Sequence, residues 1–337
     1  MSKVTSLDVA RMAGVSQSAV SRVFTPGASA SKATAEKVKD AAEKLGYRPN
    51  PIARAMITGK SRIIGLLVAY LDNQFYPVAI ERLSKALQDQ GYHILIFMTS
   101  NDEAEVDKVV QELLDYRVDG IIMASVGMSN SLTDRCAAAG IPVVMFNRGQ
   151  DGSGLSTVTS ANIEGGRKAA EFFCAAGHTR IAHVAGWQGA STGRDRRYGF
   201  EMGLTQLEVA PVAIVEGMYN RDIAAEVTRS IMAEHNPDAI FVGNDHMAFA
   251  VMDVIRNELG LSIPDDVSII GYDDVPQAGW AAYDLTTVRQ PVNRMVEATV
   301  DTILGQIETP GAPTQKTEIE GPLIVRGSAR IPEGWTQ

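Results

Sequence analysis

The chain has 337 residues, 45% hydrophobic and 21% charged, which excludes a largely disordered protein and predicts on the order of two or three folded units. Its longest strongly apolar run, Ile63 to Leu71, is much shorter than the roughly 20 residues of a membrane helix. No secretory signal is recognised, so we expect a cytoplasmic protein. Cys136 and Cys174 fit neither a disulfide framework nor a zinc site. We expect both to be buried, and we expect no metal or cofactor.

Charge is divided unevenly along the chain. Residues 1–60 contain ten Lys or Arg and four Asp or Glu, a net charge of +6, which leaves −15 for the remainder because the whole chain carries −9. A basic segment joined to an acidic body predicts that only the first segment meets a polyanion such as nucleic acid. The alternative is a basic face that is simply solvated.

Two short helices joined by a glycine turn are predicted at the start of the chain. Thr5 followed by Asp8 is typical of a capping box, and Gly14 can end the first helix in the left-handed conformation. Ser16 can cap the second helix almost immediately. This order of helix, tight turn and helix is the geometry of a helix-turn-helix.

The second helix is predicted to have one buried and one polar face. The buried stripe consists of Val20, Val23 and Phe24. The polar face lies near the helix start, where a recognition helix meets base edges, and consists of Gln17, Ser18, Ser21 and Arg22. A third helix, about Thr34 to Leu45, would close a small core. The alternative is a helical cap whose polar face only provides solubility.

A further short helix is predicted at residues 51–58, because Asn50-Pro51 is a typical helix start and Gly59 a typical end. Isolated helices need about 12–15 residues to be stable in water, so this one should form only when something packs on it. Met56 could then insert into a base step of the minor groove. The alternative is an interdomain helix with Met56 in a core.

From Arg62 onward, short apolar runs alternate with helical patterns, which predicts a doubly wound α/β architecture with parallel strands. The expected strands are Ile63–Val68, His93–Met98, Gly120–Ala124, Val143–Phe146, Ile181–Ala185, Ala239–Val242 and Val267–Ile270. The expected helices include Pro77–Gln90, Ala104–Tyr116, Ile163–Ala176 and Ile223–Glu234. These units are too many for one compact sheet.

Ligands of such folds lie beyond the carboxyl ends of the strands. The side chains predicted there are polar or aromatic: Asn73, Phe75, Tyr76, Asn147, Arg148, Trp187, Asn244, Asp245, Asp273 and Asp274. Amides, carboxylates and arginine can bind hydroxyl groups, and aromatic rings can cover the apolar faces of a pyranose, so the pattern suits a sugar.

An enzyme is the main alternative class. The sequence contains no dinucleotide-binding, phosphate-loop, nucleophile-elbow or His-Glu-x-x-His motif, and no paired metal spacing among its histidines. The closest two, His178 and His183, are expected to flank one strand. A secreted solute-binding protein is disfavoured by the basic first segment and the absent signal.

Several segments together resemble the LacI family of bacterial repressors. They are Val4–Ala10 (VTSLDVA), Ala13–Ser16 (AGVS), Val20–Val23 (VSRV), Glu36–Val38 (EKV), Leu45–Asn50 (LGYRPN) and Ala53–Met56 (ARAM). The resemblance implies a helix-turn-helix domain at residues 1–47, a hinge helix and linker at 48–60 and an effector-binding and dimerisation domain at 61–337. It implies DNA contacts from Thr5, Ser16, Gln17, Ser18, Ser21, Arg22, Ala53 and Met56. The last position usually holds leucine, so the strength of the Met56 wedge is open.

For the body, the resemblance implies two subdomains of periplasmic-binding-protein type around a cleft, about residues 61–160 with 290–320 and 161–289 with 321–332. The chain would cross between them near Ser160, Arg289 and Gly321. The resemblance implies effector contacts from Asn147, Arg196, Tyr219, Asn244, Asp274 and Gln290. With Asn73, Phe75 and Arg148 at the predicted strand ends, these are the effector residues that we predict. Asn147 stands where aspartate is common, which leaves the identity of the ligand open.

The predicted function is therefore a transcriptional regulator, a repressor as the resemblance implies, that binds a pseudo-palindromic operator as a dimer. A small polar effector, a sugar or sugar derivative, would control its affinity. A nucleobase-type or sugar-acid corepressor is the alternative. No heptad repeat ends the sequence, which favours a dimer over a bundled tetramer.

Overall fold

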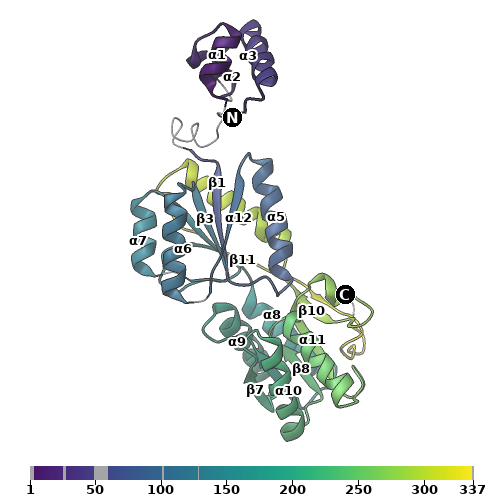
Figure 1. The fold of residues 1–337 in the computed structure, drawn as a ribbon. Helices are drawn as coiled ribbons and strands as arrows, with labels where there is room; N and C mark the ends of the chain where they lie inside the picture. Colours follow the sequence, from purple (N-terminus) through teal and green to yellow (C-terminus); the bar gives the residue numbers. More distant parts are fainter. Residues whose placement is uncertain (1–3, 26–27, 49–59, 101, 128, 336–337) are drawn as a thin grey trace. The chain divides into compact units, whose positions relative to one another are not determined.

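The structure is a computed structural model that describes residues 4–25, 28–48, 60–100, 102–127 and 129–335. It divides into two compact units, Met1–Ser61 and Arg62–Gln337, each considered by itself (Figure 1). Within the described residues, no helix is both long and apolar enough to span a membrane. The predicted hinge helix, with Ala53 and Met56, lies outside the described residues.

The first unit is a three-helix domain with helices α1 (Ser6–Ala13), α2 (Gln17–Val23) and α3 (Lys32–Leu45). The predicted capping box is present: the Thr5 N–H donates to the Asp8 carboxylate at 2.9 Å, and the Asp8 N–H donates to the Thr5 hydroxyl at 3.4 Å. Gly14 ends α1 with a φ of 66°. Helix α3 begins before the predicted Thr34 because Ser31 caps it. The core consists of Val9, Ala10, Val20, Val38, Ala41 and Ala42.

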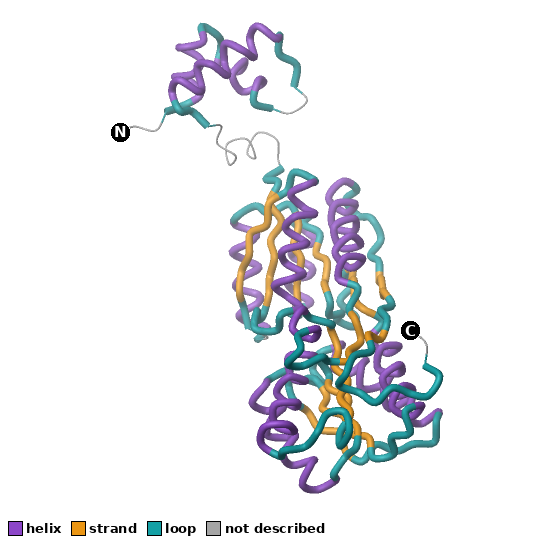
Figure 2. The backbone as a smooth tube through the Cα atoms, turned by 90° about the vertical axis from the view of Figure 1, so that its right-hand side faces the viewer, coloured by secondary structure: helices purple, strands orange, loops and turns teal. Residues whose placement is uncertain are grey.

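The second unit contains two six-stranded sheets (Figure 2). The first has the order β11-β5-β4-β3-β1-β2 and the second β12-β10-β9-β8-β6-β7. The first is formed by β1 (Ile63–Val68), β2 (His93–Met98), β3 (Gly120–Ala124), β4 (Val143–Phe146), β5 (Ser156–Ser160) and β11 (Lys316–Ile319). The second is formed by β6 (Ile181–Ala185), β7 (Ala213–Glu216), β8 (Ala239–Val242), β9 (Ser268–Asp273), β10 (Thr286–Arg289) and β12 (Leu323–Ile324). All pairings are parallel except that of β10 with β12.

Helices cover both sheets, and each sheet with its helices forms one of two lobes (Figure 1). The first lobe contains α5 (Phe75–Asp89), α6 (Glu103–Asp115), α7 (Asn130–Ala138) and α12 (Val292–Glu308). The second contains α8 (Asn162–Ala175), α9 (Ser191–Gln206), α10 (Arg221–His235), α11 (Asp245–Asp253), the π-helical turn η1 (Val254–Glu258) and the 3-10 turn η2 (Pro276–Gly279). The chain passes between lobes after β5, after β10 and after β11. The doubly wound architecture is therefore observed twice.

Several local expectations need correction. His183 does not flank a strand but lies within β6, fully buried, with Nδ1 2.9 Å from the Phe241 carbonyl oxygen. Cys136 is buried, whereas Cys174 is only partly buried. Strand β9 continues to Asp273, beyond the predicted end at Ile270. The pattern missed β5, β7, β10, β11 and β12 because these strands are short and most carry polar or charged residues.

Candidate functional site

The exposed face of α2 is a short polar surface. Ser16 caps the helix, and its hydroxyl accepts from the Ala19 N–H at 3.2 Å. Val20 is buried in the three-helix core, which turns the opposite face outward. The side chains on or next to that face are all exposed: Ser16, Gln17, Ser18, Ser21 and Arg22.

Local contacts orient part of this surface. Gln17 Nε2 donates to the Ser6 hydroxyl at 2.9 Å, which links the starts of α1 and α2. The hydroxyls of Ser16 and Ser18 lie 2.9 Å apart. Thr5 is exposed as well, but its side chain caps α1. The first turn of α2 contains no acidic residue, so the helix N-terminus keeps its partial positive charge. Such a surface can enter a DNA major groove.

A second site lies between the two lobes, where residues that follow strands of both sheets meet. Ten residues line this cleft: Tyr70, Asn73, Tyr76, Asn147, Arg148, Thr192, Arg196, Tyr219, Asn244 and Asp273. Nine carry a charged, amide or phenolic group and the tenth a hydroxyl. The free volume between them is about 10 Å³, room for about one water molecule. The cleft is thus closed on its own polar side chains.

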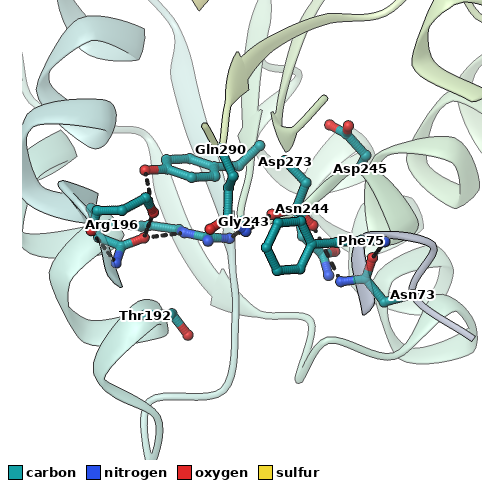
Figure 3. Close-up of polar contacts among 12 residues, drawn as sticks. Asn73, Phe75, Thr192, Arg196, Gly243, Asn244, Asp245, Asp273 and Gln290 are labelled. Atoms are coloured by element: carbon teal, nitrogen blue, oxygen red, sulfur yellow. Dashed lines mark hydrogen bonds and ion pairs between the residues drawn. The ribbon is translucent and has the colours of Figure 1, made fainter. Parts of the chain in front are cut away.

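Asp273 lies at the centre of the cleft, at the carboxyl end of β9, and three donors from different segments contact its carboxylate (Figure 3). Asn73 Nδ2 donates to it at 3.2 Å and Gln290 Nε2 at 2.7 Å. Arg196 Nη1 lies 3.5 Å from Oδ1. Burial raises the pKa of this carboxyl, while Arg196 opposes the shift. Because Asn73 belongs to the first lobe and Arg196 to the second, Asp273 connects the lobes.

The Arg196 guanidinium is almost fully buried and held on several sides. Its Nε donates to Asn162 Oδ1 at 2.9 Å, and its Nη1 donates to the Gly243 carbonyl at 2.6 Å. The guanidinium lies over the Tyr272 ring, 3.6 Å from the centroid. Helices α8 and α9 pack closely enough to place it because Gly199 contributes no Cβ, which would lie 1.9 Å from the Ile163 carbonyl oxygen. A fixed guanidinium is suited to binding ligand oxygens.

The first-lobe wall of the cleft is built around Asn147, which follows β4 with a left-handed φ of 68°. Its Nδ2 donates to the Tyr76 phenol at 2.9 Å, and that phenol also bonds Ser125. Asn147 Oδ1 is buried and has no partner within the described residues, so it can accept from a ligand. Arg148 Nη2 donates to the Tyr70 phenol at 3.2 Å.

The second-lobe wall is built at the ends of β7 and β8. Asn244 caps α11, accepting from the Met247 N–H at 2.9 Å. Tyr219 follows β7 with a φ of 57°, and its phenol donates to the Thr192 hydroxyl at 3.0 Å. Non-glycine residues in this conformation cost energy and cluster at functional sites. Asn147, Tyr219 and Asp273 all have positive φ angles, which supports a functional role for the cleft.

The rim of the cleft holds the lobes together. The Gly149 N–H donates to the Ser191 hydroxyl at 3.0 Å, and Arg194 pairs with Asp151 at 3.2 Å. The Arg148 guanidinium lies 5.5 Å from the centroid of the Trp187 ring across the rim. Any ligand that enters or leaves must separate these contacts, which makes opening and closing of the lobes part of binding.

Six of the nine predicted effector residues line the cleft, and three do not. Asp274 instead accepts from Arg289 Nε and from Arg326 Nη2, each at 2.6 Å. The two neighbouring carboxylates point in different directions because the backbone φ angle is 126° at Asp273 and 58° at Asp274. Phe75 is buried against Phe146 with ring centroids 6.1 Å apart. Gln290 supports Asp273 without lining the cleft.

The cleft also contains residues that were not predicted as effector contacts. Tyr76 lies after β1 and Asp273 at the end of β9, positions at which the sequence predicts side chains near a ligand. Tyr70 follows β1 by two residues, so its place after a strand was a usable signal. Thr192 lies in the first turn of α9, and no local pattern distinguishes it. Asp245, also at a strand end, faces away from the cleft: it accepts from Thr287 at 2.6 Å, and burial raises its pKa.

Comparisons with known proteins cover nearly the whole chain. Residues 5–50 match a family model described as bacterial regulatory proteins, lacI family, and residues 170–329 match a periplasmic binding protein-like domain. The HTH-type transcriptional repressor PurR of Vibrio parahaemolyticus is 30% identical over 327 residues, 96% of this chain and 98% of that protein. The ribose operon repressor of Escherichia coli is 28% identical over 331 residues, 96% of this chain and 99% of that protein.

Solved structures give the same result. The Lac repressor dimer bound to operator and the anti-inducer ONPF is 27% identical and has a TM-score of 0.87, covering 97% of this chain and 99% of that chain. The transcriptional regulator CelR in complex with cellobiose is 28% identical and has a TM-score of 0.74, covering 97% and 100%. The likeness thus includes both the three-helix domain and the two lobes.

Proposed function

Because the chain belongs to the lacI family of bacterial regulatory proteins, we propose that it represses transcription by binding a pseudo-palindromic operator as a dimer. A small polar effector, a sugar or sugar derivative, binds in the cleft and controls operator affinity. The observation that carries the proposal is the combination, in one chain, of an exposed recognition surface on α2 and a closed polar cleft around Asp273.

DNA recognition is assigned to the start of α2. Gln17 can pair with adenine and Arg22 with guanine in the major groove, while Thr5 and Ser16 at helix starts suit phosphate contacts. Residues 1–60 carry the net charge of +6, and the acidic body carries −15, so the operator is drawn to the first unit alone. Ala53 and Met56 are proposed to contact the minor groove.

The effector is assigned to the cleft by its chemistry. Amide, carboxylate and guanidinium groups from both lobes converge there, as a molecule with several hydroxyl groups requires. Seven of the ten lining residues carry amide, carboxylate, guanidinium or aliphatic hydroxyl groups, the three aromatic ones are tyrosines with polar phenol groups, and Phe75 lies outside the lining. This favours a sugar over a stacked nucleobase.

A nucleobase corepressor is the second candidate, favoured by the purine-repressor relative. Tyr70 and Tyr219 could provide stacking rings once the lobes separate. Binding of a purine base with no binding of any sugar would select this alternative.

Dimerisation is assigned to the second unit. Strand β2 is at the edge of the first sheet, and its side chains Ile96 and Met98 are 47% and 50% exposed. Trp280 in the second lobe is 55% exposed. An apolar edge strand is normally covered by a partner. A dimer would present two α2 helices to two half-sites about one DNA turn apart.

Regulation follows from the closure of the cleft. Effector binding changes the balance between closed and open lobes, and residues 48–60 transmit the change to the DNA-binding units. The coupling is expected to be about 1–3 kcal/mol, as in other allosteric systems. The regulator acts in the cytoplasm, where a bacterial operator lies.

Selection of duplexes from a random pool by the purified protein tests the DNA-binding part. We expect enrichment of a pseudo-palindrome at near-physiological salt. The selection is repeated with a metabolite extract, because a repressor that requires a corepressor binds its operator only when that corepressor is present. Failure to enrich any sequence under either condition would refute the proposal.

A further inference from the structure

A second hollow lies on the other side of Asp273, and we name it the hinge groove. It has a volume of about 480 Å³ and is lined by the start of α5, residues 273–276 and residues 289–294. It thus touches both lobes and the segment that joins β10 to α12. The proposed function makes no use of it.

The hinge groove and the effector cleft share a wall. Asp273 lines both, whereas Gln290 and Phe75 line the groove and not the cleft. Gln290 Nε2 donates to the same carboxylate that Asn73 and Arg196 contact from the cleft side. A ligand in the groove would therefore act directly on the residue that connects the lobes.

The lining of the groove carries an excess of positive charge. Three arginines contribute to it, namely Arg82, Arg289 and Arg294, and two acids, Asp273 and Asp274. Asp273 faces Arg196 of the cleft, and Asp274 is already held by Arg289 and by Arg326.

The other two arginines remain available to a ligand. Arg82 Nη1 donates to the neutral amide of Asn293 at 2.8 Å, and Arg82 forms no ion pair within the described residues. Arg294 is exposed and, in the described part of the chain, has no ion-pair partner within 4.0 Å. Guanidinium groups bind carboxylates and phosphates through paired N–H donors.

The N-terminus of α12 opens onto the same groove. Pro291 precedes the helix and provides no side-chain cap. The N–H groups of Asn293 and Arg294 have no acceptor within the described residues. Unsatisfied N–H groups at a helix start favour an anion.

Gln290 adds an independent indication of a ligand. Its side chain is 2% exposed, and its Oε1 atom has no hydrogen-bond partner within the described residues. A buried, unsatisfied oxygen is costly unless something donates to it. Gln290 lines the groove, but its Oε1 atom is itself buried, so a ligand hydroxyl in the groove reaches that atom only when a lining side chain moves.

We propose that the hinge groove is a second binding site, for a hydroxylated metabolite that carries a phosphate or carboxylate group. Arg82, Arg294 and the start of α12 bind the anionic group, and Gln290 accepts from a hydroxyl. The site is separate from the effector cleft and is coupled to it through Asp273.

The test is anion binding to the full chain, measured by calorimetry and by thermal unfolding at constant ionic strength. The probes are inorganic phosphate and tartrate, a hydroxylated carboxylate, with chloride as the reference. The variants are Arg82→Gln and Arg294→Gln. Arg135→Gln, an exposed arginine on α7, is the matched control in the body, and Arg11→Gln, an exposed arginine on α1, is the control in the first unit.

We expect phosphate or tartrate to raise the unfolding temperature of the wild type above that in chloride, and the better probe identifies the anionic group. Each groove variant should weaken binding about tenfold, as loss of one charge-assisted contact does, while Arg135→Gln and Arg11→Gln retain it. The proposal is overturned if neither probe binds. It is also overturned if Arg82→Gln and Arg294→Gln bind as the wild type does.

Discussion

The recognition surface on α2 and the effector cleft are built in opposite ways. The first uses five exposed side chains on or next to one seven-residue helix, namely Ser16, Gln17, Ser18, Ser21 and Arg22. The second brings together ten residues, spread along the sequence from Tyr70 to Asp273, from two lobes, and most of them are buried. A local site depends on one helix and its cap, whereas the cleft depends on the whole topology. Substitutions should therefore affect stability and function together in the cleft and separately on α2.

The largest effect is expected for Arg196→Ala. The change leaves the buried Asp273 carboxylate without its cation, which costs about 3–5 kcal/mol for a broken buried pair. Denaturant unfolding should show this loss in the second unit, and calorimetry should show loss of effector binding. Arg229→Ala, an exposed arginine on α10 that pairs with Glu258 and does not line the cleft, is the control. Unchanged effector affinity in Arg196→Ala would contradict the cleft assignment.

Acid sensitivity should be the next largest effect. Burial lowers the pKa of His183 to about 4 from 6.5. The folded state then binds fewer protons, so stability is full above pH 6.5 and falls until about pH 4, by roughly 3 kcal/mol.

His183→Phe should remove this pH dependence from the second unit, measured as the difference between the unfolding curves of variant and wild type. Burial also lowers the pKa values of His178 and His246, which adds acid sensitivity, and raises those of the carboxyls of Asp245 and Asp273, which opposes it. These contributions are present in both proteins and cancel in the difference. The first unit contains no histidine. Parallel curves for the two proteins from pH 7 to 4 would refute the assignment.

The two adjacent carboxylates allow a direct test of which one meets the effector. Asp273→Asn should weaken effector binding by about 1.5–3 kcal/mol, the value of a hydrogen bond to a charged group. Asp274→Asn should leave binding unchanged, because Asp274 contacts Arg289 and Arg326 outside the cleft. Calorimetry measures the effector affinity of both variants. A larger loss of affinity in Asp274→Asn than in Asp273→Asn would mean that Asp274 contacts the effector, as the sequence analysis predicts.

On α2, Arg22→Ala should reduce the discrimination between the correct and a wrong base by about 1–3 kcal/mol at one base pair of each half-site. Competition binding against single-base operator variants measures this. Stability should not change, since Arg22 is exposed. Arg11→Ala on α1 is the matched control. If sequence preference survives Arg22→Ala, another element reads the bases.

The smallest effect is expected for Ser31→Ala, which removes the cap of α3. The Ser31 hydroxyl accepts from the Thr34 N–H at 3.2 Å, and loss of such a cap costs about 1 kcal/mol. Only the unfolding of the first unit should shift, because the two units have separate cores. A shift of equal size in the second unit would show that the units unfold together.

The same contrast explains what could be predicted from the sequence. The α2 surface follows from caps and a glycine turn within twenty residues, so Thr5, Gly14 and Ser16 sufficed to define it. Cleft residues that follow an apolar strand, such as Asn73, Asn147 and Asn244, were predictable because the end of such a strand can be read from the sequence.

The rest depended on features that no local pattern encodes. Asp273 and Asp274 are adjacent and chemically identical, and only their positive φ angles decide which faces the cleft. Thr192 enters the cleft because α8 and α9 pack closely at their glycines. The His183 ring stacks on Phe241 and lies tilted against Phe200, two residues that are far apart in the sequence, so no local pattern indicates its buried position.

The most direct test of the account is reciprocal coupling between cleft and operator. Operator affinity is measured with and without the effector, and effector affinity with and without the operator, on the same dimer. Linkage requires both affinities to change by the same factor, and we expect about 5–150-fold. An effector that binds at Arg196 and Asp273 yet leaves operator affinity unchanged would contradict the account.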